Sequence, residues 1–107
     1  MSEIKDHKDL EAWRIAMEMV SEVYLLSGNF PENERYGLTS QMRRAAVSVP
    51  SNIAEGQARG LTRAGLNHFG IALGSLAELD TQIEIALRLG FVTSEVQPPP
   101  PTSRRTP

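Results

Sequence analysis

The sequence contains no cysteine and only two histidines, His7 and His68. Structural zinc sites need cysteine or histidine ligands, and di-iron sites of helical bundles pair a histidine with a glutamate three residues earlier. Neither histidine has such a partner at the required spacing, so we expect no metal site and no cofactor. We expect His68 to be a partly exposed residue of a helix. Because there is also no cysteine to use in an oxidising compartment, we expect a cytoplasmic protein.

Long apolar runs are missing too. No stretch approaches the roughly 20 residues that a helix needs to cross a bilayer, so we expect no membrane segment. The first residues, MSEIKDHKDLEAW, carry charges where a signal peptide needs an apolar stretch. The glycines show neither the Gly-Lys-Ser/Thr nor the GxGxxG spacing of a phosphate-binding loop. Asp80 and Glu84 lie four residues apart, but helical carboxylates at this spacing are normally solvated or paired with arginine. We therefore expect no enzymatic activity.

The residues that are present are typical of one small domain. The chain has 107 residues, of which 40% are hydrophobic and 22% are charged. We place the domain at residues 1–96. Residues 97–107, QPPPPTSRRTP, contain four consecutive prolines, which favour extended polyproline geometry. We expect this tail to be disordered, with a role as ligand for an aromatic-lined groove as the alternative.

Three segments show the apolar periodicity of helices, over residues 8–27, 38–58 and 62–89. Short connections between them predict an all-α, antiparallel up-down bundle. We expect Gly28 and Asn29 to end the first helix in left-handed geometry, Thr62 to cap the third, and Gly90 to stop it. The apolar stripes of the three helices, in chain order, are Leu10, Trp13, Met17, Val20 and Tyr24; Leu38, Met42, Ala45, Val49 and Ile53; and Leu66, Phe69, Leu73, Leu76, Ile83 and Leu87.

Pro50 lies inside the second predicted helix. A proline there has no backbone N–H to donate, and its ring crowds the carbonyl four residues earlier. We therefore predict a kink at Pro50. We also expect the Ala46 carbonyl, which loses its donor, to be satisfied by Ser48, Ser51, Asn52 or water.

The run YGLTSQMRRAAVSVPSNIAEG, the preceding DLEAWRIAMEMV and the following FGIALGSLAEL resemble the four-helix-bundle proteins encoded in intervening sequences of bacterial 23S rRNA genes. That family includes the accessory variability determinant of diversity-generating retroelements. The resemblance implies a ring-like homopentamer that binds nucleic acid or a reverse transcriptase through a basic surface. Members usually have a fourth amphipathic helix after this region. The four consecutive prolines of this tail cannot form part of an α-helix. We expect that helix to be absent or vestigial.

A missing fourth helix would leave apolar faces without a partner, so we expect the chain to self-associate. Gly70, Gly74 and Ala77 lie at positions i, i+4 and i+7 of the third predicted helix. Small residues at this spacing would let the backbone of another helix approach closely. The alternative is that they make room for bulky side chains within the same bundle.

Arginines are concentrated in the middle of the chain. Residues 35–63 hold five arginines against Glu55 alone, whereas residues 1–34 hold three basic residues against eight acidic ones. Guanidinium groups bind phosphate bidentately, so the best candidates for a nucleic-acid contact are Arg43, Arg44, Arg59 and Arg63.

Three observations oppose that interpretation. The arginines could instead form ion pairs within the bundle or between subunits, as Glu55 could with Arg59 or Arg44. Arg43 and Arg44 leave the helix about 100° apart, which predicts that they do not face one groove. No aromatic residue is interleaved with the arginines, and the isoelectric point is only about 5.6. From the resemblance we nevertheless predict a non-enzymatic assembly module that forms a ring-like homo-oligomer and binds nucleic acid or a reverse transcriptase through an arginine patch, with a structural or protein-interaction scaffold as the alternative.

Overall fold

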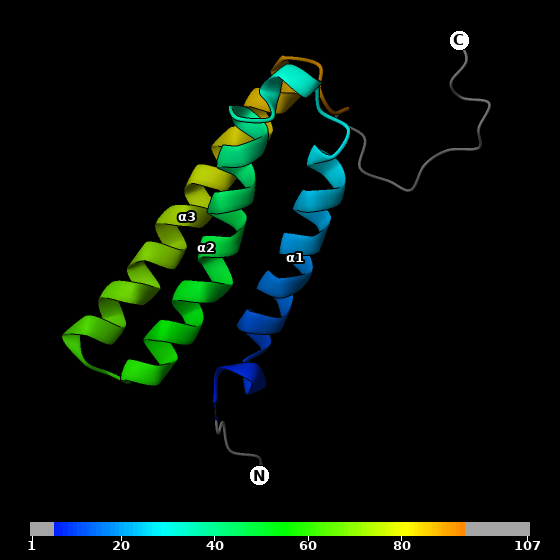
Figure 1. The fold of residues 1–107 in the computed structure, drawn as a ribbon. Helices are drawn as coiled ribbons and strands as arrows, with labels where there is room; N and C mark the ends of the chain where they lie inside the picture. Colours follow the sequence, from blue (N-terminus) through cyan, green and yellow to red (C-terminus); the bar gives the residue numbers. More distant parts are fainter. Residues whose placement is uncertain (1–5, 94–107) are drawn as a thin grey trace.

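The structure is a computed structural model that describes residues 6–93. It contains three α-helices, α1 (Glu11–Ser27), α2 (Leu38–Arg59) and α3 (Arg63–Arg88), and two 3-10 turns, η1 (His7–Asp9) and η2 (Glu32–Glu34). Consecutive α-helices run antiparallel, and α2 lies between α1 and α3 (Figure 1). The described range has no strand, so the all-α prediction is confirmed. The predicted proline-rich tail and the place of a fourth helix fall in residues 94–107, outside the described part.

The first α-helix begins at Glu11 rather than near Lys8. Asp6 caps the preceding turn, since its carboxylate accepts a hydrogen bond of 2.8 Å from the backbone N–H of Lys8. Asp9 in turn accepts a bond of 3.3 Å from the N–H of Asp6. Leu10 then takes an extended conformation, which separates η1 from α1. These residues therefore form a turn of their own and do not extend the helix.

The other helix ends follow the predicted signals with one exception. The Thr62 hydroxyl accepts a bond of 3.0 Å from the N–H of Gly65 and caps α3. Gly60 and Gly90, with φ of 69° and 79°, follow the ends of α2 and α3. Gly28, however, has a φ of −64°, so the expectation of left-handed geometry after α1 is wrong. The chain turns there in right-handed geometry and brings Phe30 into the core.

The stripe predicted for the middle helix forms the core. Leu38, Met42, Ala45 and Val49 are buried, and Ile53 is partly buried. These residues can be buried together because α2 has a neighbour on both sides, whereas α1 and α3 approach no closer than 8 Å between Cα atoms. A groove lined by residues of α1, α3 and the segment after α3 opens between these two helices.

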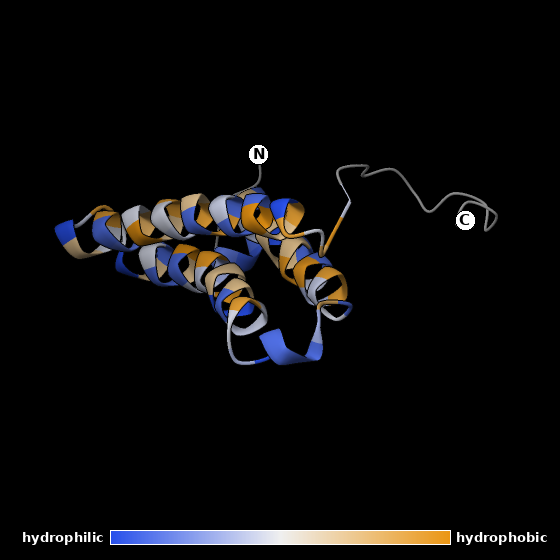
Figure 2. Ribbon diagram, turned by 90° about the horizontal axis from the view of Figure 1, so that it is seen from above, coloured by the Kyte–Doolittle hydropathy of each residue, from blue (hydrophilic) through white to orange (hydrophobic). Residues whose placement is uncertain are grey.

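The stripes predicted for the outer helices are only partly buried. On α1, Met17 and Tyr24 are 42% and 43% exposed, while Ala16 and Val23 occupy the interior. The reason is that α1 contacts a helix on one side only, so half of its stripe has nothing to pack against. Figure 2 shows hydrophobic residues on several sides of the helices, not only where the helices meet.

On α3, three leucines of the apolar stripe are exposed: the exposed fractions of Leu66, Leu73 and Leu76 are 56%, 67% and 40%. The side of α3 that meets α2 instead carries mostly small or polar buried residues: Gly65, Ala72, Ser75, Leu79, Gln82 and Ala86. Small side chains let α2 and α3 pack closely. The apolar strip of α3 is thereby turned toward the groove shared with α1, where Ile83 and Leu87 form part of the lining.

Pro50 is buried inside α2, which continues through it from Leu38 to Arg59. In the described range no side chain hydrogen-bonds the Ala46 carbonyl. Asn52 instead donates to the carbonyl and the hydroxyl of Ser48, at 2.9 Å and 3.0 Å. The expected side-chain partner for Ala46 is therefore not formed, and the kink stays a prediction.

Gly70 and Gly74 do not make room for other side chains between residues 6 and 93. A Cβ atom built on either glycine would meet no atom within 4 Å, and Ala77 beside them is exposed. The alternative that these residues accommodate bulky neighbours within the described part is thus wrong. Close approach by a second molecule stays a prediction.

Candidate nucleic-acid interface

A basic hollow opens between the end of α1, the turn η2 and the first half of α2. We call it the arginine hollow. Its lining combines arginines, tyrosines and hydroxyl side chains with one valine: Tyr24, Arg35, Tyr36, Thr39, Ser40, Arg43, Arg44, Val47 and Ser48. No acidic residue contributes to this lining. The antiparallel hairpin of α1 and α2 creates the hollow by placing the last turn of α1 beside the first turns of α2.

Arg43 holds α1 and α2 together at the floor of the hollow. Its Nε donates to the Ser27 hydroxyl at 2.8 Å, and its Nη2 donates to the Tyr24 carbonyl at 3.2 Å. The guanidinium also lies over the Tyr24 ring, 4.5 Å from the centroid. A cation at the end of α1 satisfies carbonyls of the last turn and complements the helix dipole. Arg43 therefore has a structural role, and only its remaining N–H groups are available to a ligand.

Arg44 and Arg35 are held more loosely. Arg44 donates from Nη1 to the Ser40 hydroxyl at 3.3 Å, at an exposed position. Arg35 pairs with Glu32 at 3.2 Å, with side chains 65% and 85% exposed. Such an exposed pair contributes at most about 1 kcal/mol, so a phosphate can replace the carboxylate. Arg35 and Arg44 are therefore the cations of the hollow that are best placed to meet an anion.

The two tyrosines differ in how open their rings are. Tyr36 is 87% exposed, and the Arg35 guanidinium lies 5.7 Å from its ring centroid. Tyr24 is 43% exposed and carries the Arg43 guanidinium on its ring. No aromatic residue is interleaved along the chain with the four arginines selected from the sequence, as expected, but the fold places Tyr24 and Tyr36 beside the arginines of the hollow. The hollow contains both the charge and the aromatic surface that a nucleic acid can use.

The four arginines selected from the sequence do not form one cluster. Arg43 and Arg44 line the same hollow, contrary to the expectation from their 100° separation, because long side chains can converge from neighbouring directions. Arg59 lies 15 residues further along α2, which corresponds to about 22 Å. Arg63 begins α3 at the same end of the bundle as Arg59.

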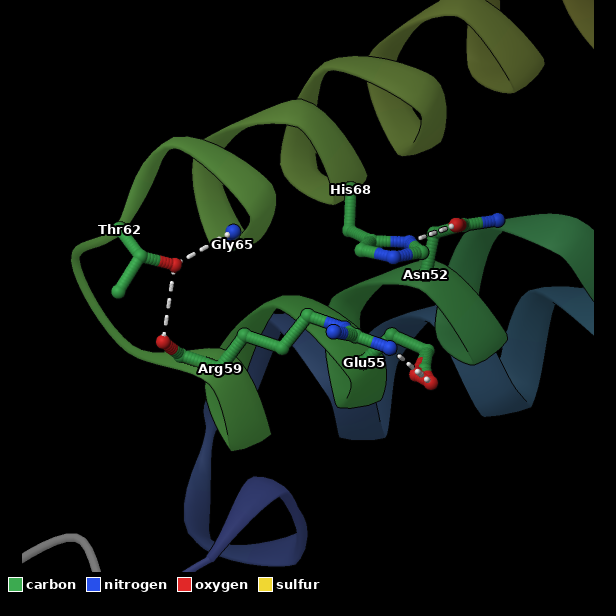
Figure 3. A network of polar contacts seen from close by, with 6 residues as sticks. All are labelled: Asn52, Glu55, Arg59, Thr62, Gly65 and His68. Atoms are coloured by element: carbon green, nitrogen blue, oxygen red, sulfur yellow. Dashed lines mark hydrogen bonds and ion pairs between the residues drawn. The ribbon is translucent and has the colours of Figure 1, made fainter.

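Arg59 is the last residue of α2 and Arg63 is the first residue of α3, on either side of the turn that joins these helices. Figure 3 shows Arg59 in this turn region. Arg59 pairs with Glu55 at 3.7 Å, which confirms one of the two partners expected for this glutamate. The Arg59 carbonyl accepts a 3.1 Å bond from the hydroxyl of Thr62. Arg63 is exposed and has no ion-pair partner among the described residues. This end of the bundle has two arginines, but no tyrosine accompanies them.

His68 takes part in a chain of hydrogen bonds that joins α2 to α3. Its Nδ1 lies 2.8 Å from the Oδ1 of Asn52, as Figure 3 shows. The Asn52 amide reaches Ser48, and the Ser75 hydroxyl donates to the Ser48 hydroxyl at 2.8 Å. Each of these four side chains, Ser48, Asn52, His68 and Ser75, therefore has a hydrogen-bond partner. We assign them to the packing of α2 on α3.

The described part of the chain offers neither a metal site nor a membrane-spanning helix. Between residues 6 and 93 there is no group of three or more histidine, aspartate or glutamate side chains that could hold a metal ion. None of the helices in that range combines the length and apolar character needed to cross a membrane. Of the two carboxylates considered for acid–base chemistry, Glu84 pairs with Arg88 at 2.9 Å, as expected for a helical acid.

Arg35, Tyr24 and Tyr36 were not among the site residues predicted from the sequence. Their positions in and beside the connection between α1 and α2 could have identified them. Tyr24 and Arg43 lie at similar distances from the middle of the connection between α1 and α2, so an antiparallel hairpin brings them together. Arg35 and Tyr36 immediately precede α2 and therefore lie beside its first turn.

Comparison with known proteins identifies the family. No curated protein matches the sequence significantly. The family model of the 23S rRNA-intervening sequence protein matches residues 8–98, which includes all three α-helices and the arginine hollow. Because this match extends over most of the chain, the protein belongs to the 23S rRNA-intervening sequence protein family.

Proposed function

We propose that the protein is a non-enzymatic helical assembly module whose copies form a ring-like homo-oligomer and bind nucleic acid through the arginine hollow. The observation that supports nucleic-acid binding best is the convergence of three arginines on a hollow without an acidic lining residue. Guanidinium groups bind phosphate bidentately, and a local basic surface can attract phosphate even on a weakly acidic protein. Of the three arginines, only Arg35 has an acidic partner, the exposed Glu32, and the α1 acids Glu11, Glu18 and Glu22 form no ion pair within the described residues.

Self-association is supported by the apolar groove between α1 and α3. The lining includes Met19 and Leu26 of α1 and Ile83 of α3, and the exposed strip of α3 continues from it through Leu76 and Leu73. The core beneath is thin, since Met42 and Val49 are its largest fully buried side chains. A small domain with so little buried volume gains stability when a partner covers such a face. We propose that a second copy of this chain is that partner, in a pentamer as the family resemblance implies.

Replacing Leu73 and Leu76 together with glutamate is expected to abolish self-association, because charges would have to be buried in the contact between copies. Sedimentation equilibrium at tens of micromolar protein measures the change. We expect an oligomer for the wild type and a monomer for the double variant. Leu61→Glu is the matched control, since Leu61 is 90% exposed and lies in the turn between α2 and α3. A wild-type protein that sediments as a well-folded monomer would contradict the assembly proposal.

For nucleic-acid binding, the double variant Arg35→Gln with Arg44→Gln is expected to weaken binding to all sequences alike. The slope of log affinity against log salt should become shallower by about one for each arginine removed, since fewer counterions are released. Filter binding of RNA and DNA across a salt series measures both effects. Arg59→Gln with Arg63→Gln removes the same charge at the other end of α2 and is expected to have a smaller effect. A larger effect of this control pair would place the site outside the arginine hollow.

A scaffold without a nucleic-acid role is the second candidate. The internal hydrogen bonds of Arg43 favour it, because they show that at least one arginine serves the fold. In that case the wild type should show no detectable binding even at about 50 mM salt, where contacts from several arginines are strong. Removing the arginines would then change only the melting temperature or the oligomer. The family resemblance also implies a reverse transcriptase as a protein partner of the first candidate, the assembly module.

A further inference from the structure

We propose that the arginine hollow binds single-stranded nucleic acid, with one base stacked on Tyr36 and the adjoining phosphates bound by Arg35 and Arg44. This inference rests on the proposed nucleic-acid function and specifies its ligand class. It starts from Tyr36, the more exposed tyrosine of the hollow. Tyr36 is 87% exposed, and the Arg35 guanidinium lies 5.7 Å from its ring centroid.

Tyr36 has no role in the core that would explain its position. It lies between η2 and α2 and is absent from the hydrophobic core cluster, in contrast to Phe30 and Leu38 on either side of this connection. The backbone around it is held firmly, since the Glu34 carboxylate accepts a 3.0 Å bond from the Leu38 N–H. An aromatic ring on a fixed backbone loses little conformational freedom when it stacks on a base. Tyr36 is therefore a preorganised platform.

Tyr24 does not offer a second open ring for stacking. The Arg43 guanidinium already lies over the Tyr24 ring at 4.5 Å, and the same side chain is hydrogen-bonded to Ser27. A base would have to displace these contacts in order to stack on Tyr24. The Arg35 guanidinium also lies over the Tyr36 ring, but at 5.7 Å from its centroid and, within the described residues, without a hydrogen bond to α1, and Tyr36 is 87% exposed, so Tyr36 is the ring that is more open to a ligand.

The surroundings favour a strand that runs along one side of α2. Arg44 and Ser48 also line a neighbouring depression that reaches α3, where Glu78 and Ser75 take part in the lining. The Glu78 carboxylate would repel phosphates on that side. The hollow itself has no acidic lining residue, and on the side of η2 the carboxylate of Glu32 pairs with Arg35 at an exposed position where a phosphate can replace it. The backbone of a bound strand is therefore expected to follow Arg44 and Arg35 past Tyr36.

Single-stranded nucleic acid fits this arrangement better than a duplex. The bases of a duplex are stacked on one another, so an exposed ring cannot reach their faces without opening the helix. Unpaired bases are free to stack on aromatic side chains, and this contact tolerates any sequence because every base has a π face. Two arginines and one open tyrosine match the combination of charge and stacking used by single-strand binders.

Fluorescence anisotropy with labelled oligo(dT) and oligo(U) of about 20 nucleotides, longer than a typical single-strand site, tests the inference. A duplex of equal length serves as the comparison, and all measurements use the full-length protein in low salt. Tyr36→Ala is expected to weaken single-strand binding roughly 5-fold to 100-fold, which is the usual effect of losing one stacked base. Tyr36→Phe keeps the ring and is expected to bind like the wild type. Leu61→Ala, a truncation of another highly exposed side chain, is expected to change nothing.

The possible results separate this inference from the proposed function. If the wild type binds nucleic acid and the loss of Arg35 and Arg44 weakens it, but Tyr36→Ala leaves single-strand binding unchanged, the stacking inference is overturned while the proposed function stands. Equal affinity for duplex and single strand would overturn it in the same way. If the wild type binds neither ligand, both fail. Because Tyr36 is exposed, we expect the melting temperature of Tyr36→Ala to match that of the wild type, so that a loss of binding reports the contact and not unfolding.

Discussion

Replacing Met42 with alanine is expected to lower the free energy of unfolding by about 2–5 kcal/mol. Met42 is 0% exposed and belongs to the core cluster in which α2 meets both other helices. Truncation removes several buried methylene-sized groups and leaves a cavity that the surrounding helices fill only in part. Since small domains are stable by only about 5–15 kcal/mol, this loss would leave a marginal fold.

Met17→Ala is the matched control for this prediction. Met17 is the same residue type on α1, but it is 42% exposed, so its truncation is expected to cost less than about 1 kcal/mol. Urea denaturation followed by circular dichroism measures both variants. The protein concentration must be held constant, because self-association would make the apparent stability depend on concentration. Equal destabilisation by the two changes would mean that α2 is not the centre of the core.

The second large effect is expected from Gly65→Ala, near the start of α3. A Cβ atom at this position would overlap the carbonyl oxygen of Gly60 and would lie 3.1 Å from that of Gly56. Both obstacles are backbone atoms, so no side chain can move aside to relieve the contact. The turn between α2 and α3 would have to open, at a cost of about 3 kcal/mol, the upper end of the usual range for atoms forced into a packed site.

Gly70→Ala provides the control within the same helix. A Cβ atom there meets nothing within 4 Å, and alanine favours a helix interior over glycine by up to about 1 kcal/mol. At a protein concentration too low for self-association, thermal denaturation is therefore expected to show a lower melting temperature for Gly65→Ala and an equal or higher one for Gly70→Ala. A decrease of similar size in both variants would indicate that glycine is required for a reason other than the contact with Gly60.

The arginine hollow shows why the candidate site could be predicted only in part. Arg43 and Arg44 were found because they stand out in a helical segment with few acids. Their different roles could not be read from adjacent positions, since the bonds from Arg43 to Ser27 and Tyr24 join residues that are 16 and 19 positions apart. Arg59 and Arg63 were grouped with them because they are close in sequence. In the fold they lie near the other end of α2, since a helix lengthens by about 1.5 Å per residue.

Sequence alone was sufficient for the features that depend on short-range order. Apolar periodicity predicted the three helices, Thr62 and Gly90 marked the ends of α3 correctly, and the stripe of α2 is the core. These features could be predicted because helix capping and the spacing of residues on a helix face involve groups within a few positions of one another. Amphipathicity, however, shows only that a helix has an apolar face.

Tertiary structure alone decided what that apolar face contacts. On α3, small residues such as Ala72 and Ser75 let α2 pack against one side, and this turned Leu73 and Leu76 outward although their spacing is that of a core stripe. The same antiparallel packing placed Tyr24 beside Arg43 and so assembled the hollow. Both outcomes depend on the distance between two packed helices and on how each helix is rotated about its axis. The side chains of both helices determine these two quantities together.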